Sequence, residues 1–92
     1  MKIVFDPAFI RKLKKLNVRT RKIFKERILL FSKNPNDLQL DNHVLRDEYK
    51  KYRCIDITSD YRAIYEEIHT DDGKVAYFIT IGTHGELYRR HK

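Results

Sequence analysis

Apolar residues recur every three or four positions through the first third of the chain. Residues 2–5 alternate well enough for a short strand, and Asp6-Pro7 follows at once. Aspartate is a favoured helix cap and proline fits the first helical position, so this pair predicts a helix start. The apolar positions after it, at helical spacing, are Phe9, Ile10, Leu13 and Leu16.

A second amphipathic segment begins near Thr20, after Asn17-Val18 interrupts the pattern, and ends at Asn34-Pro35. A proline disfavours the helical conformation of the residue before it, which predicts the end of the helix there. Two such helices joined by a few residues predict an αα-hairpin. Residues 34–41 are polar and predict a loop, pinned onto the body by Leu40, Val44 and Leu45.

The second half of the chain changes to short β-prone runs at residues 52–57, 61–68 and 74–82. Residues 58–60 and 70–73 separate these runs, and the second turn holds an Asp-Gly pair typical of hairpins. The pattern predicts one α+β domain over residues 1–92: a short N-terminal strand, an αα-hairpin, and an antiparallel three-stranded meander that completes a single sheet with the first strand. Gly82 and Gly85 predict a sharp turn that displays His84 at a strand end.

Charge is distributed unevenly along the 92 residues, whose formal net charge is +7. Residues 1–33 hold eleven Lys/Arg and two acids, a balance of +9, whereas residues 34–92 hold nine Lys/Arg and eleven acids, a balance of −2. Such an excess suits a polyanionic partner, although a solvated helix face is the simpler explanation of any one lysine. The candidate RNA-binding lysines on the two helices are Lys14, Lys15, Lys22 and Lys25.

The single cysteine, Cys54, cannot form an intramolecular disulfide, which favours a reducing compartment. We find no signal peptide and no apolar run of about twenty residues, so we expect a cytoplasmic protein without a membrane segment. No Cys/His cluster has metal-ligand spacing, so we expect neither a metal nor another cofactor.

Side chains suited to RNA cleavage cluster at position 43, at 60–62 and at 84–88. RNA brings its own nucleophile, the 2′-hydroxyl. A base must take its proton, a cation must stabilise the phosphate oxyanion, and an acid must protonate the leaving 5′-oxygen. Histidine, arginine, aspartate and tyrosine suffice for these tasks without a metal.

Three segments resemble the RelE/ParE superfamily of bacterial toxins. They are Asp60-Tyr61-Arg62-Ala63-Ile64-Tyr65, Ile81-Gly82-Thr83-His84-Gly85-Glu86-Leu87-Tyr88, and Leu40-Asp41-Asn42-His43-Val44-Leu45 with Tyr52-Arg53 after it. The ending is most similar to the YafQ-like branch of ribosome-dependent mRNA interferases. The resemblance implies a RelE-like fold and a metal-independent endoribonuclease, the toxin of a type II toxin–antitoxin system. Its implied partners are a cognate antitoxin, the ribosome and mRNA, with operator DNA bound only through the antitoxin.

The resemblance also implies site residues. His84 is the first candidate for acid–base catalysis, and Arg62, similar to an arginine of RelE, is the candidate for phosphate stabilisation. Pairing of Arg62 with Asp60 or Glu86 on the surface is the alternative. Further catalytic candidates are His43, Tyr88 and Asp60. Arg53 matches a basic position of RelE and is a further RNA-binding candidate.

Two departures from the YafQ-like pattern affect the assignment of roles. Asp56 stands where that branch has a second histidine, and Arg62 is more RelE-like. Which group is the base and which the acid therefore stays open, as does any substitution of Asp56 for that histidine. The alternative functions are a ParE-like non-enzymatic gyrase inhibitor of the same fold and a catalytically decayed RNA-binding homologue.

Overall fold

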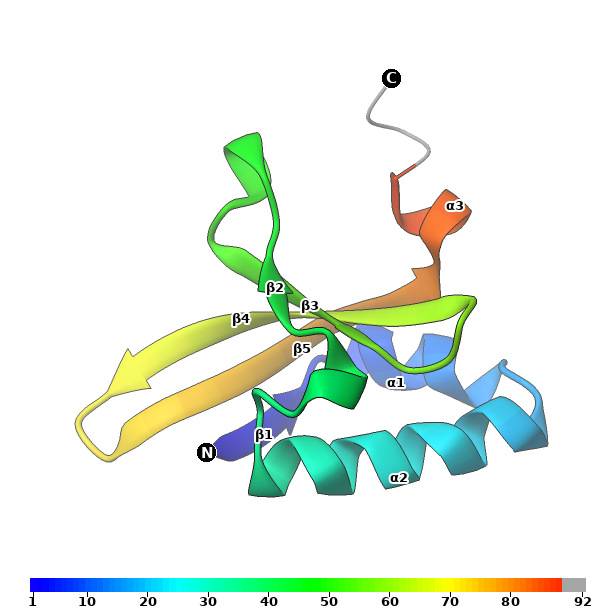
Figure 1. Cartoon of the computed structure of the whole chain (residues 1–92), viewed down its shortest axis with the longest axis horizontal. Helices are drawn as coiled ribbons and strands as arrows, with labels where there is room; N and C mark the ends of the chain where they lie inside the picture. Colours follow the sequence, from blue (N-terminus) through cyan, green and yellow to red (C-terminus); the bar gives the residue numbers. More distant parts are fainter. Residues whose placement is uncertain (89–92) are drawn as a thin grey trace.

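Five strands form one mixed sheet in the order β1-β5-β4-β3-β2 (Figure 1). The computed structural model describes residues 1–88, with only the backbone at positions 48 and 88. The strands are β1 Lys2–Phe5, β2 His43–Val44, β3 Tyr52–Asp56, β4 Tyr61–Thr70 and β5 Gly73–Thr83. β1 runs parallel to β5 and every other pair is antiparallel, so the predicted meander, its union with the first strand and the α+β class are confirmed.

Two helices, α1 Pro7–Lys14 and α2 Val18–Lys33, cover one face of the sheet, whereas α3 His84–Tyr88 rises from the other (Figure 1). The connections contain two short 3₁₀ turns, η1 Leu38–Leu40 and η2 Asp47–Tyr49. No helix within residues 1–88 is long and apolar enough to cross a membrane.

Side-chain caps set both helix starts. The carboxylate of Asp6 accepts from the backbone N–H of Ala8 at 2.8 Å, as the sequence predicted. Asn17 accepts in the same way from Thr20 at 2.8 Å, so α2 begins at Val18 and the predicted start at Thr20 is wrong. Asparagine is among the best N-cap residues, so Asn17-Val18 starts the helix instead of merely interrupting the pattern.

Asp6 also joins α1 to the sheet, because it accepts a hydrogen bond from the Tyr77 hydroxyl of β5. This bond, helped by the one from Ala8, holds the pKa of Asp6 below its ordinary value. The same bond raises the pKa of Tyr77. The start of the first helix is therefore fixed to a central strand by a charged hydrogen bond, which is stronger than a neutral one.

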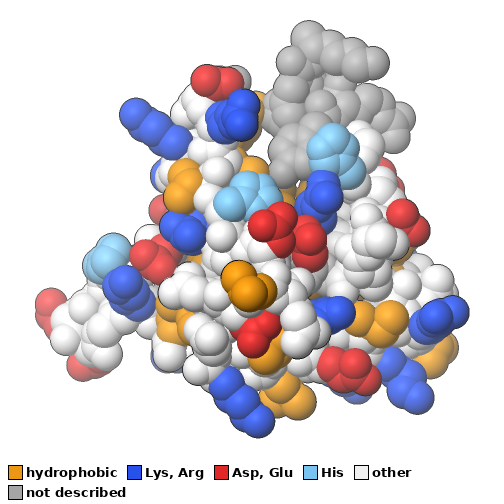
Figure 2. All heavy atoms as spheres, viewed as in Figure 1, with side chains coloured by type: hydrophobic (Ala, Val, Ile, Leu, Met, Phe, Trp, Pro, Cys, Tyr) orange, Lys and Arg blue, Asp and Glu red, His pale blue; other side chains and the backbone are white. Residues whose placement is uncertain are grey.

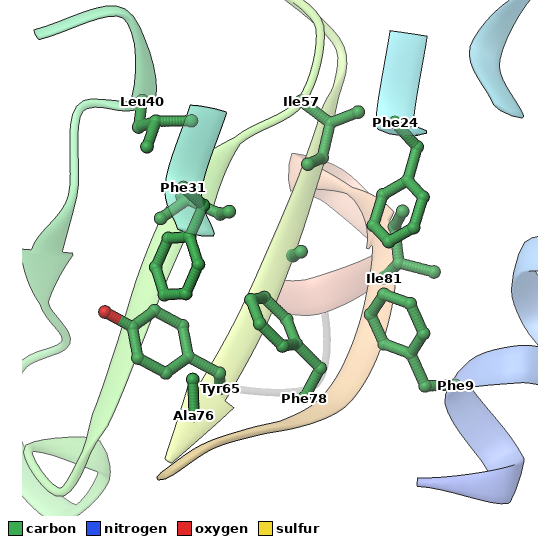
Figure 3. Packing of buried hydrophobic residues seen from close by; sticks show 11 residues of the cluster. Phe9, Phe24, Phe31, Leu40, Ile57, Tyr65, Ala76, Phe78 and Ile81 are labelled. Carbon is green, nitrogen blue, oxygen red and sulfur yellow. The ribbon is translucent and has the colours of Figure 1, made fainter. Parts of the chain in front are cut away.

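Aromatic rings from the helices and the sheet form the centre of the core (Figure 3). Phe31 of α2 packs edge-on against Tyr65 of β4 with 5.1 Å between ring centroids, and Tyr65 lies 5.0 Å from Phe78 of β5. Phe9 and Phe24 extend the cluster to the other end of the helix layer. A buried phenylalanine truncated to alanine typically costs about 3–5 kcal/mol, so these rings are what hold the helices on the sheet.

A β-bulge interrupts the alternation of β5. Tyr65 pairs with Phe78 and Ile64 pairs with Thr80, which leaves Ile79 as an extra residue. Phe78 and Ile81 are therefore both buried in the core, although they are three positions apart. The bulge explains why simple alternation makes residues 75–81 look apolar on both faces of the strand. It also directs Thr80 and Gly82 away from the helices.

The segment after α2 differs from the predicted loop. Leu40 is fully buried, as expected, but Val44 is 46% exposed, so its predicted packing is wrong. Val44 lies instead in β2, a two-residue strand at the edge of the sheet that the sequence did not predict. The hairpin turn lies at residues 70–73 as predicted. Its two central residues are Asp71-Asp72 and not an Asp-Gly pair, and Gly73 after them has the positive φ, 113°.

Candidate active site on the open face of the sheet

The face of the sheet opposite α1 and α2, here called the open face, carries several candidate residues. Cross-strand partners in a sheet point to the same side. One row of Cα partners is His43, Cys54, Ile64 and Thr80, and the next is Asp56, Arg62 and Gly82. The register therefore brings His43, Asp56 and Arg62 onto one face. Figure 2 shows histidine, acidic and basic side chains gathered between β2 and α3.

Asp56 and Arg62 form an ion pair across β3 and β4. The Nε of Arg62 donates to Oδ1 of Asp56 at 3.0 Å, and both side chains are about one-third exposed, 28% and 31%. Asp56 is thus a partner of Arg62 that the sequence did not suggest. A contact through Nε fixes the plane of the guanidinium, whose geometry suits a phosphate.

His43 is held in a defined tautomer by the backbone. Its Nδ1 lies 2.7 Å from the carbonyl oxygen of Asp41. A carbonyl oxygen only accepts, so Nδ1 must hold the hydrogen. In the neutral ring Nε2 is then a proton acceptor, and the half-exposed side chain leaves it accessible. This arrangement suits a general base.

His84 lies at the start of α3 and not in a glycine turn. β5 continues through Gly82 to Thr83, and Gly85 lies inside the helix, so the predicted glycine turn is wrong. His84 is nevertheless exposed directly after the end of the strand, as predicted. Thr83 and Glu86 form a capping box: the Thr83 N–H donates to Oε1 of Glu86 at 2.8 Å, and the Glu86 N–H donates to Oγ1 of Thr83 at 3.2 Å. The spacing of this threonine and glutamate was the signal that the sequence analysis missed.

The helix α3 lies over the open face because Gly82 makes room for it. A Cβ on Gly82 would come within 3.1 Å of the Glu86 carboxylate and 3.3 Å of the Leu87 side chain. Gly82 is the Cα partner of Arg62, so α3 begins beside the row that holds the Asp56–Arg62 pair. His84, its first residue, is exposed there.

The other predicted catalytic residues lie at the same end of the sheet. Asp60 is exposed in the turn before β4, where its N–H donates to Oγ1 of Thr58 at 3.1 Å. Tyr61, the next residue, pairs with Thr83. Tyr88 ends α3, and its side chain lies outside what the structure describes.

The structure separates Arg53 from Arg62. Arg53 is the Cα partner of the core residue Tyr65, so it points to the helix-covered face. Its Nε donates to Oδ1 of Asn42 at 2.9 Å. The lysines predicted to bind RNA are exposed on the helix layer, also across the sheet from the open face: Lys14, Lys15, Lys22 and Lys25.

One lysine that the sequence analysis left out reaches the border of the open face. Lys12 of α1 donates from Nζ to Oγ1 of Thr80 at 3.0 Å. β1 ends at Phe5, and α1 runs beside the part of β5 that β1 leaves uncovered. No local pattern could have indicated this contact, since the two residues are 68 positions apart. Within the described part of the chain, no three His, Cys, Asp or Glu residues gather as a metal site.

Known structures share this fold. The chain is similar to YafQ from E. coli, with 25% identity over 95% of this chain and 97% of that one, at a TM-score of 0.73. The YoeB/ParE toxin from Agrobacterium tumefaciens has 16% identity and the same TM-score, over 91% and 99% of the two chains. The toxin–antitoxin complex RelBE2 from Mycobacterium tuberculosis matches at 20% identity, over 89% and 95%, with a TM-score of 0.71. A comparison with curated protein sequences gives no match.

The family is shown by a sequence model that spans most of the chain. Residues 3–88 match the model of the ParE toxin of the type II toxin–antitoxin system parDE. The similar structures carry the names YafQ and YoeB/ParE, in agreement with the RelE/ParE resemblance noted in the sequence. The chain thus belongs to the ParE toxin family of type II toxin–antitoxin systems, within the RelE/ParE superfamily.

Proposed function

We propose that this toxin is a metal-independent endoribonuclease that cleaves mRNA on the ribosome. The observation that favours this function most is the set of side chains on the open face. A histidine with a free acceptor nitrogen and an arginine fixed by a carboxylate share that face, and a second histidine begins the helix beside them. These are the base, the charge stabiliser and the acid that cleavage by the 2′-hydroxyl needs.

In this proposal His43 acts as the general base. Its Nε2 takes the proton of the 2′-hydroxyl while Nδ1–H stays bonded to the Asp41 carbonyl. The 2′-oxygen then attacks phosphorus and the bond from phosphorus to the 5′-oxygen breaks, which leaves a 2′,3′-cyclic phosphate. β2 and β4 are two strand spacings apart, about 10 Å, a span suited to a base and an oxyanion stabiliser on either side of one sugar–phosphate unit.

Arg62 and His84 complete the reaction. The guanidinium of Arg62, oriented by Asp56, stabilises the negative charge on the phosphoryl oxygens. His84, in its imidazolium form, donates a proton to the leaving 5′-oxygen. His43 therefore gains one proton during the reaction and His84 loses one. Tyr88 and Asp60 remain candidates at the same end of the sheet, Tyr88 for stacking on a base beside the scissile bond.

The partners follow from the same proposal. The basic helix layer contacts ribosomal RNA while the open face meets mRNA, because the two surfaces lie on opposite sides of the sheet. A cognate antitoxin neutralises the toxin, as expected for this family; a similar structure, RelBE2, is a toxin–antitoxin complex. The family match also favours a second candidate function, non-enzymatic inhibition of DNA gyrase.

Alanine substitution of the two groups separates these functions. We expect His84→Ala and Arg62→Ala each to lower mRNA cleavage on translating ribosomes by about 10²–10⁴-fold, since each removes one catalytic role. Both variants should also relieve growth arrest on overexpression. The measurement is the cleavage rate of a reporter mRNA, with EDTA added under conditions that keep the ribosomes intact.

The matched control is His69→Ala, because His69 is an exposed histidine at the far end of β4. It should cleave like the wild type. A His84→Ala protein that stays fully toxic, leaves mRNA intact and perturbs DNA supercoiling would establish the gyrase inhibitor instead.

A further inference from the structure

A hollow of about 350 Å³ lies on the helix-covered face, at the end of the sheet away from α3. The N-terminus, the end of α2 and three strands meet around it (Figure 1). Its volume falls in the range of small-ligand sites, about 300–1,000 Å³. The polar side chains that line it are Asn36, Asn42, Arg53, Tyr65, Glu67 and Lys74. None of them belongs to the proposed active site on the open face.

A hydrogen-bond network fixes the inner wall. Asn42 uses both N–H groups, one to the Pro35 carbonyl at 2.9 Å and one to the Tyr65 hydroxyl at 2.8 Å. Its carbonyl oxygen accepts from Nε of Arg53 at 2.9 Å. The Pro35 carbonyl can only accept and the arginine can only donate, so this orientation of the amide is the one that satisfies all partners. The plane of the Arg53 guanidinium is thereby fixed before any ligand arrives.

The Tyr65 hydroxyl is a donor directed at the hollow. The residue is 1% exposed, and its ring packs in the aromatic cluster while the oxygen points out of it (Figure 3). The oxygen accepts from Asn42. Burial raises the pKa of Tyr65 although Asn42 and the charge of Arg53 act to lower it, so the hydroxyl keeps its proton at neutral pH. The hydroxyl can donate this hydrogen to a ligand.

The charged residues around the hollow indicate which kind of ligand it binds. Arg53 and Lys74 supply two cationic groups, and the one acid, Glu67, lies 3.8 Å from Lys74. Two apolar residues line the site, Met1 and Pro35. Val44 on the edge strand β2 is the Cα partner of Arg53 and lies on the same face of the sheet. Met1 and Val44 are 41% and 46% exposed. Cationic donors suit a carboxylate, because charge-assisted hydrogen bonds are the stronger ones, and the nearby apolar groups suit apolar side chains on either side of it.

We propose that this hollow binds an acidic side chain of an apolar peptide segment from a protein partner, with Arg53, Tyr65 and Lys74 as donors to the carboxylate. A nucleic acid fits less well, because the apolar residues Met1 and Pro35 would face its phosphates. The site is independent of the proposed nuclease activity, since it lies on the other face of the sheet.

A peptide titration followed by NMR tests the proposal on the whole protein. The probe is a capped tripeptide with glutamate between two leucines, and its control carries glutamine in place of the glutamate. We expect saturable shifts of the amides around the hollow and an affinity at least about tenfold higher for the glutamate peptide, as charge-assisted hydrogen bonds require. Equal affinities, or no shift with either peptide, would overturn the proposal.

Variants of the walls sharpen the test. Arg53→Gln and Lys74→Gln should each lower the affinity for the glutamate peptide toward that for the glutamine control. Glu67→Gln should tighten binding, because it removes the acid that competes for Lys74. Lys50→Gln, an exposed residue at the end of η2, should leave the affinity for the glutamate peptide unchanged.

The amide spectrum verifies folding of each variant, and Lys74→Gln remains informative if Arg53→Gln does not fold, since Lys74 is half exposed. A hexauridylate that shifts the hollow amides more strongly than the glutamate peptide would assign the site to RNA.

Discussion

At the scale of the residue, the open face is defined by hydrogen bonds that fix the state of each reacting group. The Asp41 carbonyl sets the tautomer of His43, and Asp56 sets the plane of Arg62. Asp56 already accepts from a guanidinium, so it is suited to positioning Arg62 and less suited to taking a proton from RNA. The aspartate at the place of the expected histidine thus has a structural explanation.

Two substitutions of Asp56 test this role. Asparagine keeps an oxygen that accepts from Arg62 Nε, whereas alanine keeps none, so we expect Asp56→Asn to retain far more cleavage activity than Asp56→Ala. Loss of a hydrogen bond to a charged group corresponds to about ten- to a hundredfold in rate. The measurement is kcat and KM for mRNA cleavage, with the pH profile of each variant. If asparagine is as inactive as alanine and the acidic limb of the pH profile is lost, Asp56 is the base.

At the scale of the element, α3 has only five residues and would not be stable as an isolated helix. Helices this short are unstable in water, because nucleation costs more than one turn of hydrogen bonds returns. The capping box of Thr83 and Glu86 and the bare backbone of Gly82 are what hold it on β5. The position of His84 therefore depends on these three neighbours.

Removing the cap should loosen α3 without unfolding the protein. Thr83→Ala removes the side-chain acceptor for the Glu86 N–H, a change that typically costs about 1 kcal/mol at a helix N-cap. We expect faster amide exchange at residues 85–88, a lower cleavage rate and a nearly unchanged melting temperature. Thr83→Ser keeps the hydroxyl and should restore both properties. Unchanged exchange in Thr83→Ala would mean that packing alone places the helix.

At the scale of the whole molecule, the sheet separates two chemically different surfaces. The helix layer carries the excess positive charge of residues 1–33, whereas the open face carries the ion pair of Asp56 and Arg62. Charges on a solvated helix face contribute little to folding, since exposed pairs are worth at most about 1 kcal/mol. The excess is therefore available for a polyanion.

Reversal of four lysines tests the helix layer. The variant replaces Lys14, Lys15, Lys22 and Lys25 by glutamate, all of them exposed. We expect steeply weaker ribosome binding, a shallower dependence on salt and an unchanged melting temperature, because each lost phosphate contact lowers the slope of log K against log salt by about 0.7–0.9. Glutamine at the same positions should give an intermediate effect. If ribosome binding depends neither on salt nor on these substitutions, the four lysines are only solvated surface residues.

The sequence alone determined the two long helices, the first strand and the three-stranded meander, together with their order. Periodicity identified the αα-hairpin and the three long strands, because each amphipathic element must bury one face and its pattern records which. It failed where local patterns are short or interrupted: at the two-residue strand β2, at the bulge at Ile79, and at α3, whose capping box resembled a glycine turn. The edge strand and the bulge depend on pairing with other strands, whereas the capping box of α3 is a local signal that was not recognised.

Only the tertiary structure decided which side of the sheet each candidate occupies. The resemblance to RelE suggested that Arg53 and Arg62 share a task, yet strand register places them on opposite faces, since neighbours along a strand alternate and the pairing fixes their phase. The same register brings Asp56 to Arg62 and leaves Arg53 with Asn42 and Tyr65. The chemistry of each side chain is thus determined by the sequence, and its neighbours are determined by the fold.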